Sequence, residues 1–362
     1  MITMYDHHTR IFRIVNWDLF PAIIWFNLAY LVVNFSSICS ILMVAAGFSQ
    51  LVRVYYDSLS IAPKGKGVVI TGCDSGFGHQ LAEKLHSMDF HVYACCLDEK
   101  SRGSLILHSI GKITGRLHVI HMDVNSQKDV DNARHYVENC LPEHGLWAIV
   151  NNADRYDVGF LEWLPVETYE TLASVNLFGA IRVTKAFLPL VRNSRGRIVN
   201  VSSILGRVAA PFLGAYCITK HGINAFSDVL RLEMKSFDVH VITVEPGNYL
   251  SSANSDSCKE DLVLMARHMW NRLDGSLQKD YERDSLERQL RIGELLLELS
   301  KRNGGFVTNA MTEALYRVHP KNRYLETSMF DKFLTIMIYF LPTSLIDRLR
   351  LMFHANLLSV NR

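Results

Sequence analysis

A glycine-rich turn between a β-branched run and a helical pattern constrains the fold of this 362-residue chain more than any other feature. The run is Val68–Ile70, and the turn reads Thr-Gly-Cys-Asp-Ser-Gly-Phe-Gly over residues 71–78. Such runs are typical of strands buried in a parallel sheet. Glycines in the turn let the backbone approach a pyrophosphate, whose charge the N-terminus of the next helix favours. The pattern predicts an α/β fold, a doubly wound parallel sheet, with a nucleotide site at its first turn.

Three side chains suited to proton transfer occur further along the chain. Tyr216 and Lys220 share one face if their segment is helical, and Ser203 lies thirteen residues upstream of the tyrosine. An ammonium group favours a phenolate, so we expect Lys220 to lower the pKa of Tyr216 from its ordinary value of about 10. Such a tyrosine acts as a general acid or base on an alcohol or carbonyl oxygen. Ser203 would hold that oxygen through a hydrogen bond. Taken alone, the spacing also fits an exposed helix face.

These motifs occur in the order that they have in the short-chain dehydrogenase/reductase family, and the chain resembles that family from Lys66 to Arg323. Asp123 and Val124 resemble the pair that contacts adenine after the third strand. Residues 145–153 resemble the fourth strand and its Asn-Asn-Ala turn. Several motifs are similar to those of the branch that holds 3-hydroxybutyrate dehydrogenase, retinol dehydrogenases and 17β-hydroxysteroid dehydrogenases.

The resemblance implies a complete reaction centre and a cofactor site. Tyr216 would take the proton of an alcohol while hydride passes to a nicotinamide, and Ser203 would hold the reacting oxygen. Lys220 would also bind the nicotinamide ribose, and Asn176, at the family's fourth catalytic position, would support a water that carries the proton away. The cofactor site implied by the resemblance consists of Thr71, Gly72, Ser75, Gly76, Phe77, Gly78, Asp98, Asp123, Val124, Asn151, Ala153, Tyr216, Lys220, Pro246 and Gly247.

Asp154 departs from the family pattern, because the Asn-Asn-Ala turn normally ends in glycine. Glycine suits a position that passes close to the cofactor with a positive φ, which aspartate adopts at a cost of about 1 kcal/mol. Asp154 would either turn to solvent and cap the next segment, or place its charge near the cofactor. In the second case we expect Asp154→Gly to tighten NAD binding and raise activity.

The residues around the expected ribose position favour NAD. Asp98 comes slightly after the end of the expected second strand, where an acid would bind the ribose, and no arginine for a 2′-phosphate stands there. NADP is not excluded. Ser251 or Ser252 replaces the threonine that often follows Pro-Gly in the family, and either serine retains the hydroxyl.

The chain carries no charged residue between Asp18 and Arg53. So long a run predicts a membrane segment, with residues 1–60 as the anchor region. It is longer than one crossing of a hydrocarbon core of ~30 Å requires and short for two. A single span and a hairpin broken at residues 34–37 both remain open. The endoplasmic reticulum membrane is favoured, with a mitochondrial membrane as the alternative.

The catalytic domain is expected over residues 64–325, with a substrate lid around residues 250–305. Residues 326–362 would form an amphipathic tail, whose apolar segment 333–341 is too short to span a membrane and would lie in its interface or cover the core. The lid region has an apolar stripe that fits a packed amphipathic helix as well as a substrate lid. That stripe consists of Leu262, Met265, Met269, Trp270 and Leu273.

Charge and cysteine content exclude some classes of function. A net charge of +2 and a pI near 8.1 give no nucleic-acid footprint. The seven cysteines are scattered, without a Cys-x-x-Cys pair or metal-ligand spacing, so we expect reduced thiols and no metal site.

Together these features predict a membrane-anchored NAD(P)-dependent oxidoreductase that interconverts a hydrophobic secondary alcohol and its ketone. A steroid or sterol-derived alcohol, ecdysteroids included, is the first candidate substrate and a retinoid the second. The alternatives are (R)-3-hydroxybutyrate dehydrogenase and a cofactor-binding scaffold that has lost its activity. A homo-oligomer is also compatible with the sequence.

Overall fold

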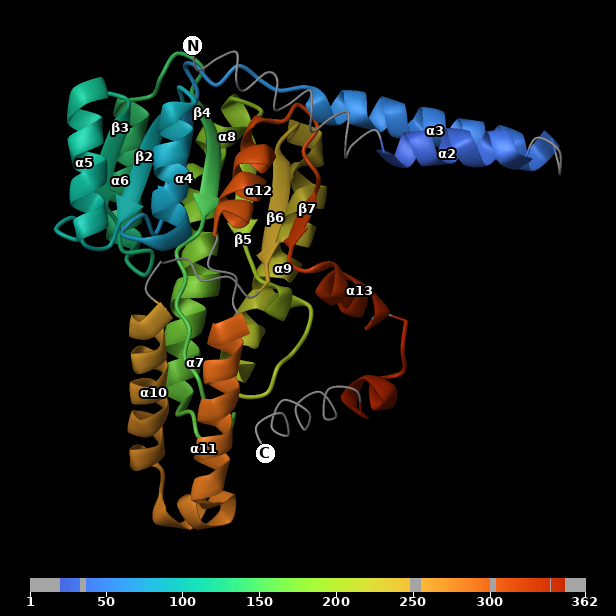
Figure 1. Cartoon of the computed structure of the whole chain (residues 1–362). Helices are drawn as coiled ribbons and strands as arrows, with labels where there is room; N and C mark the ends of the chain where they lie inside the picture. Colours follow the sequence, from blue (N-terminus) through green and yellow to red (C-terminus); the bar gives the residue numbers. More distant parts are fainter. Residues whose placement is uncertain (1–19, 33–36, 248–254, 300–303, 339, 349–362) are drawn as a thin grey trace. The chain divides into compact units, whose positions relative to one another are not determined.

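The computed structural model describes residues 20–32, 37–247, 255–299, 304–338 and 340–348. Two compact units can be distinguished. The larger comprises Pro63–Leu315 with Lys321–Arg362, and the smaller comprises Met1–Ala62 with Tyr316–Pro320. Figure 1 shows a sheet flanked by helices in the larger unit and two long helices in the smaller one.

Seven parallel strands form one sheet in the order β3-β2-β1-β4-β5-β6-β7. The order reverses direction at β1, which confirms the predicted doubly wound fold (Figure 1). The strands are short and apolar because helices cover both faces of the sheet. The strands are β1 (Gly67–Thr71), β2 (His91–Cys96), β3 (Leu117–His121), β4 (Leu146–Asn151), β5 (Arg197–Val201), β6 (His240–Pro246) and β7 (Arg323–Glu326).

Helices connect the strands, and serines cap two of them. The hydroxyl of Ser101 accepts from Ser104 N at the start of α5, and Ser126 does the same for Asp129 N at the start of α6. The sheet-covering helices are α4 (Gly76–Ser87), α5 (Arg102–Thr114), α6 (Gln127–Asn139), α8 (Ala180–Asn193), α9 (Gly214–Glu233) and α12 (Gly305–Tyr316). A further helix, α7 (Val166–Ala173), lies beyond the sheet and contributes Leu172 to a separate apolar cluster (Figure 1). The shorter turns are η2 (Ser174–Gly179), η3 (Ile204–Gly206) and η4 (Met234–Phe237).

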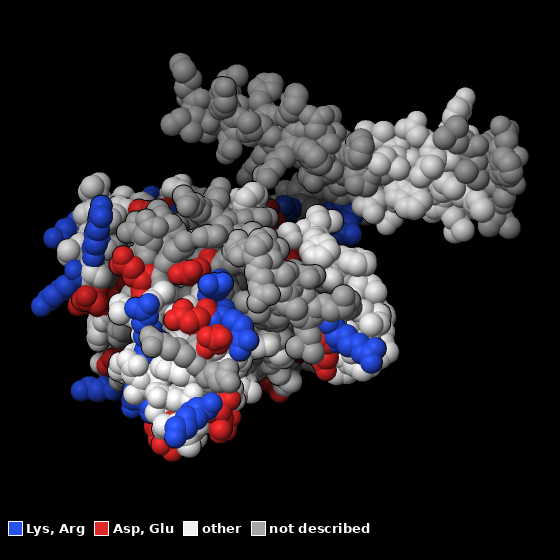
Figure 2. Space-filling model, turned by 60° about the horizontal axis from the view of Figure 1, so that its bottom comes forward, with Lys and Arg blue, Asp and Glu red and all other residues white. Residues whose placement is uncertain are grey.

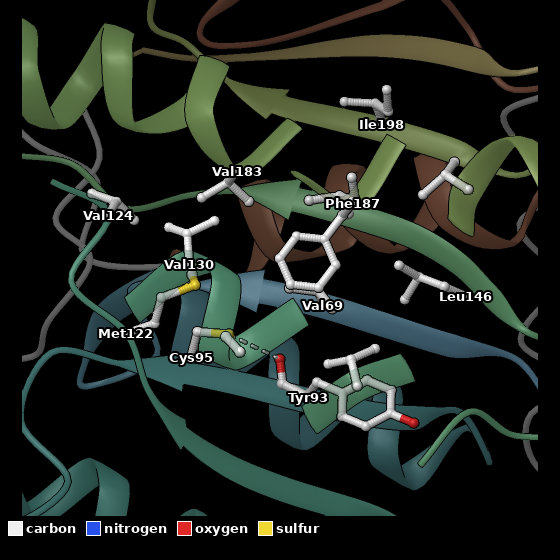
Figure 3. Packing of buried hydrophobic residues seen from close by; sticks show 14 of the residues in the cluster. Val69, Tyr93, Cys95, Met122, Val124, Val130, Leu146, Val183, Phe187 and Ile198 are labelled. Atoms are coloured by element: carbon white, nitrogen blue, oxygen red, sulfur yellow. Dashed lines mark hydrogen bonds between the residues drawn. The ribbon is translucent and has the colours of Figure 1, made fainter. Parts of the chain in front are cut away.

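One face of the sheet packs on α6, α8 and α9 through a continuous apolar core. Val69 of β1 and Phe187 of α8 are fully buried there, and Figure 3 shows the Phe187 ring beside Val69. The buried ring of Tyr93 leaves no unpaired polar group, because its hydroxyl donates to the Cys140 carbonyl. Burial contributes about 1.5–3 kcal/mol for each large apolar side chain, so this core is a main source of the sheet's stability.

The opposite face is covered by α4, α5 and α12 (Figure 1). Leu81 of α4 and Met311 of α12 are fully buried, and the Thr308 hydroxyl lies 3.1 Å from Gln80 Oε1. This contact places α12 beside α4 although they are far apart in the chain. The indole N–H of Trp147 donates to the Leu315 carbonyl at 2.9 Å, which ties α12 to β4.

Two further helices pack on the larger unit beyond the carboxyl edge of the sheet. They are α10 (Ser255–Arg272) and α11 (Gly275–Leu299). Met269 and Leu290 are buried in an apolar cluster that also holds Trp163, whose ring lies 5.3 Å from that of Trp270. The described residues of the predicted stripe pack in this cluster, with Met265, Trp270 and Leu273 partly buried. The side chain of Leu262 lies outside the described residues.

In the smaller unit, α2 (Phe20–Val32) and α3 (Ser37–Ser58) pack side by side. A Cβ at Gly47 would lie 3.1 Å from Phe26 Cζ, so glycine permits this close approach. Two helices, rather than one continuous span, favour the hairpin interpretation. The predicted break at 34–37 falls largely on residues 33–36, which lie outside the described residues.

The surface of these helices is apolar on the sides that face outward. Ile41, Leu42 and Phe48 are each more than three-fifths exposed, and Figure 2 shows an almost uncharged surface here, whereas basic and acidic side chains are interspersed on the larger unit. By length and composition, Cys39–Tyr56 could cross a membrane. The second candidate, Val166–Asn193, is 39% buried, and its α8 part packs on the sheet.

The C-terminal tail begins with the short helix α13 (Met329–Met337), capped by Ser328, whose hydroxyl accepts from Asp331 N at 3.0 Å. Its apolar side chains are largely exposed, with Phe330 62% and Phe333 58% accessible. The predicted apolar segment 333–341 therefore does not cover the core over its described residues.

Candidate active site

Most of the predicted site residues lie at or just after the carboxyl ends of six strands, whereas Asn176 lies in η2, and Tyr216 and Lys220 lie on α9. Parallel strands end at the same edge of a sheet, so the loops after β1 to β6 gather there, on either side of the point where the strand order reverses. Ser251 and Ser252 follow β6 but lie outside the described residues.

The turn after β1 has the shape of a phosphate cradle. Gly72 and Gly76 have positive φ angles of 69° and 64°, which glycine adopts without strain. A Cβ at Gly78 would lie 2.3 Å from Gly72 O, so no larger residue fits. Ser75 makes no side-chain cap on α4, and the first N–H groups of a helix have no intrahelical partner. The turn, with Phe77 in the first turn of α4, therefore fits a dinucleotide pyrophosphate.

Thr71 fastens this cradle to the loop after β4. Its hydroxyl accepts from Asn152 N at 2.9 Å and from Ala153 N at 2.8 Å. The Asn152 amide donates to the carbonyls of Thr71 at 2.9 Å and Gly72 at 3.1 Å. Asn152 is missing from the predicted set, although its place in the Asn-Asn-Ala turn was a signal for it.

The side chain of Asn151 is directed into the fold. It is buried, and its amide donates to Thr184 Oγ1 at 2.9 Å and to Asn200 Oδ1 at 2.7 Å. These bonds fix the end of β4 against β5 and α8.

Asp74 joins the cradle to the end of β2. Its carboxylate accepts from Leu97 N at 3.1 Å and from Asp98 N at 2.7 Å. Asp98 itself is exposed, with one carboxylate oxygen accepting from Lys100 N at 2.9 Å. Asp74 is absent from the predicted site residues, because a hydrogen bond between two separate loops has no local pattern in the sequence.

Asp123 and Val124 form the turn after β3. Asp123 Oδ1 accepts from Asn125 N at 2.8 Å, and the Val124 carbonyl accepts from Arg182 of α8. The buried Val124 side chain packs on Gly179, where a Cβ would lie 2.8 Å from Val124 Cγ2. The pair is therefore held at the same edge of the sheet as the cradle.

Asp154 bridges the two reacting side chains of α9. The Tyr216 hydroxyl donates to Asp154 Oδ2 at 2.8 Å, and Lys220 Nζ lies 3.0 Å from Asp154 Oδ1. Lys220 is buried and donates to the Val201 carbonyl at 3.2 Å, with its Nζ 5.2 Å from the centre of the Tyr216 ring. The spacing of four residues thus places both groups on one helix face, as predicted.

The expectation that Lys220 lowers the pKa of Tyr216 is wrong for this arrangement. Burial raises the pKa of Tyr216 well above its ordinary value, and Asp154 raises it further through its negative charge and its hydrogen bond. The ammonium group of Lys220 instead pairs with Asp154.

Neither of the placements considered for Asp154 describes its position fully. Its side chain is 35% exposed, yet both of its oxygens bind groups of α9. Asp154 is not among the non-glycine residues with positive φ, so its backbone carries no left-handed strain. The charge faces the tyrosine and the lysine.

Asn176 holds the loop that carries Asp154. It lies in η2, a π-helical turn of a kind that is frequent at functional sites. Its amide accepts from Arg155 N at 2.8 Å, donates to Arg155 O at 2.7 Å and lies 3.1 Å from Thr219 Oγ1. Asn176 therefore fixes the residue after Asp154 and links it to α9.

Ser203 lies between the end of β5 and the end of β6. Its hydroxyl donates to the Pro246 carbonyl at 3.4 Å and accepts from Leu205 N at 3.1 Å. The preceding Ser202 donates to the Lys220 carbonyl at 3.2 Å, which ties this segment to α9. Gly247 N donates to Glu326 O at 2.7 Å and continues the pairing of β6 with β7.

A buried carboxylate supports the end of β6. The side chain of Glu245 is fully buried, 2.8 Å from Arg207 Nε and 2.6 Å from Arg323 Nη1. Arg323 also pairs with Asp228 of α9. This ionic cluster holds β6, β7, η3 and α9 together beneath Pro246.

The fold and the arranged residues define a nucleotide-binding oxidoreductase of the tyrosine–lysine type. A family model for the short chain dehydrogenases matches residues 66–261. The chain belongs to the short-chain dehydrogenase family, as the sequence predicted, and is an enzyme that works with a nicotinamide cofactor.

Relatives of the predicted branch match most of the chain. Mitochondrial D-beta-hydroxybutyrate dehydrogenase of Rattus norvegicus is 40% identical over 79% of this chain and 83% of its own. The 17-beta-hydroxysteroid dehydrogenase type 6 of Bos taurus is 38% identical over 84% of this chain and 94% of its own. Retinol dehydrogenase 16 of Homo sapiens is 37% identical over 78% and 87%. The branch prediction is thereby confirmed.

A solved short-chain dehydrogenase from Burkholderia phymatum, in complex with NAD, has the same fold. It superposes with a TM-score of 0.62 over 76% of this chain and 93% of its own, at 19% sequence identity.

Proposed function

We propose that the chain is a membrane-anchored, NAD-dependent dehydrogenase of hydrophobic secondary alcohols, with a steroid or sterol-derived alcohol as first candidate and a retinoid as second. The observation that carries this proposal is the Tyr216–Lys220 pair beside the glycine cradle, at one edge of the sheet. Both parts are required to bring an alcohol carbon and a nicotinamide together.

When bound, the nicotinamide supplies the acceptor for hydride. In our proposal, Tyr216 exchanges the proton of the substrate oxygen, and Ser203 orients that oxygen. Lys220 orients the ribose and the tyrosine. Asn176 acts through the backbone of Arg155, which it holds at both ends, and so keeps the loop after β4 in register with α9.

NAD is favoured over NADP by the charges at the end of β2. The carboxylates of Asp74 and Asp98 follow the two strands on which the adenine ribose would lie, and a 2′-phosphate would add negative charge there. We therefore expect the enzyme to bind NAD more tightly than NADP.

We expect Asp74→Ala to weaken NAD binding by about tenfold, because the carboxylate's two hydrogen bonds to the β2 loop contribute on the order of 1–2 kcal/mol in a solvated position. Titration of the full chain in detergent with NADH would measure the loss. Glu99→Ala removes an exposed acid from the same loop and serves as the matched control. Equal binding by Asp74→Ala and Glu99→Ala would contradict the role given to Asp74.

An apolar cluster next to the site supports the proposed substrate class. Phe160, Trp163 and Trp270 belong to the cluster that joins the loop after β4 to α10 and α11. We assign these helices to the substrate lid, which would present an apolar wall to a lipid-like alcohol. The steroid and retinol dehydrogenases among the relatives support the same class.

The second candidate substrate is (R)-3-hydroxybutyrate, favoured by the 40% identity to a hydroxybutyrate dehydrogenase. Such a substrate requires a cation for its carboxylate. Arg155 and Arg272 line one hollow near the lid, but Asp157 and Glu167 line the same hollow and balance their charge. The structure therefore favours the hydrophobic alcohol.

We propose that α2 and α3 anchor the enzyme in a membrane, the endoplasmic reticulum first and a mitochondrial membrane as alternative, and that α13 lies in the membrane interface. The chain should stay in the membrane pellet after a carbonate wash, because the two helices expose large apolar side chains. A chain lacking residues 1–60 should be released in larger part. Complete release of the full chain by carbonate would contradict the anchor.

Isolated membranes that contain the chain, supplied with NAD or NADP and a panel of steroid, retinoid and short hydroxy-acid alcohols, test the proposed function. We expect NAD reduction with a steroid or a retinoid. Turnover confined to 3-hydroxybutyrate would replace the first candidate by the second.

A further inference from the structure

The carboxylate of Asp154 has the geometry of a proton acceptor for Tyr216. The tyrosine hydroxyl donates its hydrogen to Oδ2 at 2.8 Å, within the range of a strong hydrogen bond to a charged acceptor. The phenolic oxygen keeps its lone pairs for a second partner, so it can accept a proton from an alcohol while it gives its own to Asp154.

We propose that Asp154 accepts the Tyr216 proton during alcohol oxidation, so that the tyrosine reacts as a phenol and does not ionise beforehand. This inference rests on the proposed function. The alcohol O–H bond breaks as an O–H bond forms on Tyr216, while the original Tyr216 O–H bond breaks and one forms on Asp154. A bound nicotinamide would take up the carbinol hydrogen with its electron pair, as hydride, and Asp154 would then release one proton to water.

Contacts on both sides of the carboxylate fix it for this task. The other oxygen of Asp154 lies 3.0 Å from Lys220 Nζ, and the side chain of Lys220 is only 2% exposed. Asn176 holds both backbone groups of the next residue, Arg155. Because Asp154 remains 35% exposed, water can reach it and remove the proton.

The raised pKa of Tyr216 agrees with such a relay. Burial and Asp154 keep the tyrosine protonated at neutral pH, so oxidation through a preformed phenolate would be slow there.

The other charged groups around the pair have partners of their own. On the loop after β4, the Asp157 carboxylate accepts from Val158 N, and Arg155 shares a hollow with Asp157, Glu167 and Arg272. On the remaining elements, Arg207 pairs with Glu245 at 2.8 Å, His221 Nδ1 lies 2.8 Å from the Cys217 carbonyl, and the Cys217 thiol lies 3.4 Å from Ala210 N.

The relay predicts a distinctive pH dependence. Initial oxidation rates of the wild-type chain should change less than threefold between about pH 6 and pH 8, since a tyrosine that passes its proton to Asp154 as it accepts the alcohol proton requires no prior phenolate. In Asp154→Asn the amide fills the same space but accepts no proton, so oxidation requires the phenolate and should fall about tenfold for each pH unit below the Tyr216 pKa. Asp157→Asn removes the same charge from the same loop and should keep the wild-type profile.

A spectroscopic titration provides a readout that does not depend on turnover. The chain has 14 tyrosines, so the Tyr216 phenolate is isolated as the difference between each protein and its Tyr216→Phe counterpart. The ionisation midpoint should fall in Asp154→Asn, and further in Asp154→Gly, where Lys220 faces Tyr216 without a counter-charge. Asp157→Asn should leave it in place.

Formate distinguishes a proton acceptor from a structural group. In Asp154→Gly the missing carboxylate leaves room for a small one, so added formate should raise oxidation at pH 6 at least tenfold, whereas Asp154→Asn should not respond.

Two results would overturn the relay: wild-type rates that rise about tenfold per pH unit from pH 6 to 8 in step with the Tyr216 midpoint, or an unshifted midpoint in Asp154→Asn. Absence of oxidation by the wild-type chain at every pH, with every alcohol, would instead contradict the proposed function, and the relay with it. The pH profile of an active wild-type enzyme thus distinguishes a failure of the relay from a failure of the proposed function.

Discussion

Replacing Tyr216 by phenylalanine should reduce turnover by about 10²–10⁴-fold and leave the fold and cofactor affinity unchanged. The aromatic ring stays in place beside Lys220, and only the hydroxyl that exchanges the proton is lost. The Lys220–Asp154 ion pair does not require the tyrosine, so the loop after β4 should keep its position. Steady-state rates, together with NADH titration and a thermal melt, measure the three quantities.

Tyr169→Phe is the matched control for this change. Its hydroxyl donates to the Leu161 carbonyl at 2.8 Å, and no described hydrogen bond or ion pair joins it to Tyr216 or Lys220. The control should retain wild-type turnover. Near-normal turnover in Tyr216→Phe would show that another group exchanges the proton and would remove the basis of the mechanism.

Removing the buried carboxylate of Glu245 should destabilise the larger unit by about 3 kcal/mol, the lower end of the cost of breaking a buried ion pair. We take the lower end because Arg207 and Arg323 are 20% and 25% exposed, and water can partly replace the lost partner. In a domain of this size, that loss lowers the melting temperature by roughly 6–12 °C.

Thermal melts of Glu245→Ala and of the exposed control Glu233→Ala, both as full chains in detergent, measure this effect. The control should melt within a degree or two of wild type, because surface substitutions change stability by only about 0.5 kcal/mol. Equal melting temperatures for the two variants would mean that the cluster beneath β6 does not stabilise the fold.

Local spacing explains why so much of the fold and of the site could be predicted. The glycines after β1 are dictated by positive φ angles and by a close approach that leaves no space for a Cβ. The helical period places Tyr216 and Lys220 on one face whatever surrounds them. Such features are properties of short segments, and the sequence contains all the information that they require.

The contact that sets the chemistry of Tyr216 could not be predicted in this way. Asp154 and Tyr216 are 62 positions apart, and their hydrogen bond depends on how the loop after β4 meets α9. The rule that an ammonium lowers the pKa of a neighbouring phenol is sound, but it assumes that no third charge intervenes. Asp74 was missed for the same reason, since its bonds cross from one loop to another.

Asp154 also bears on the alternative of a scaffold without activity. Its departure from the family pattern would suggest decay if its charge displaced the reacting groups. Instead, it binds both of them in the order expected for an intact pair, with Lys220 still buried beneath. Asp154 therefore contributes to the arrangement of Tyr216 and Lys220 and does not displace them.

Transfer of deuterium from a labelled alcohol to NAD tests the central claim most directly. A 17β-hydroxysteroid with deuterium on its carbinol carbon, incubated with membranes that contain the wild-type chain, should yield NADH that carries one deuterium per ketone formed. Membranes with Tyr216→Phe should yield almost none in the same time. Ketone formed without label in NADH, or label found in NADPH alone, would contradict the account of an NAD-dependent dehydrogenase.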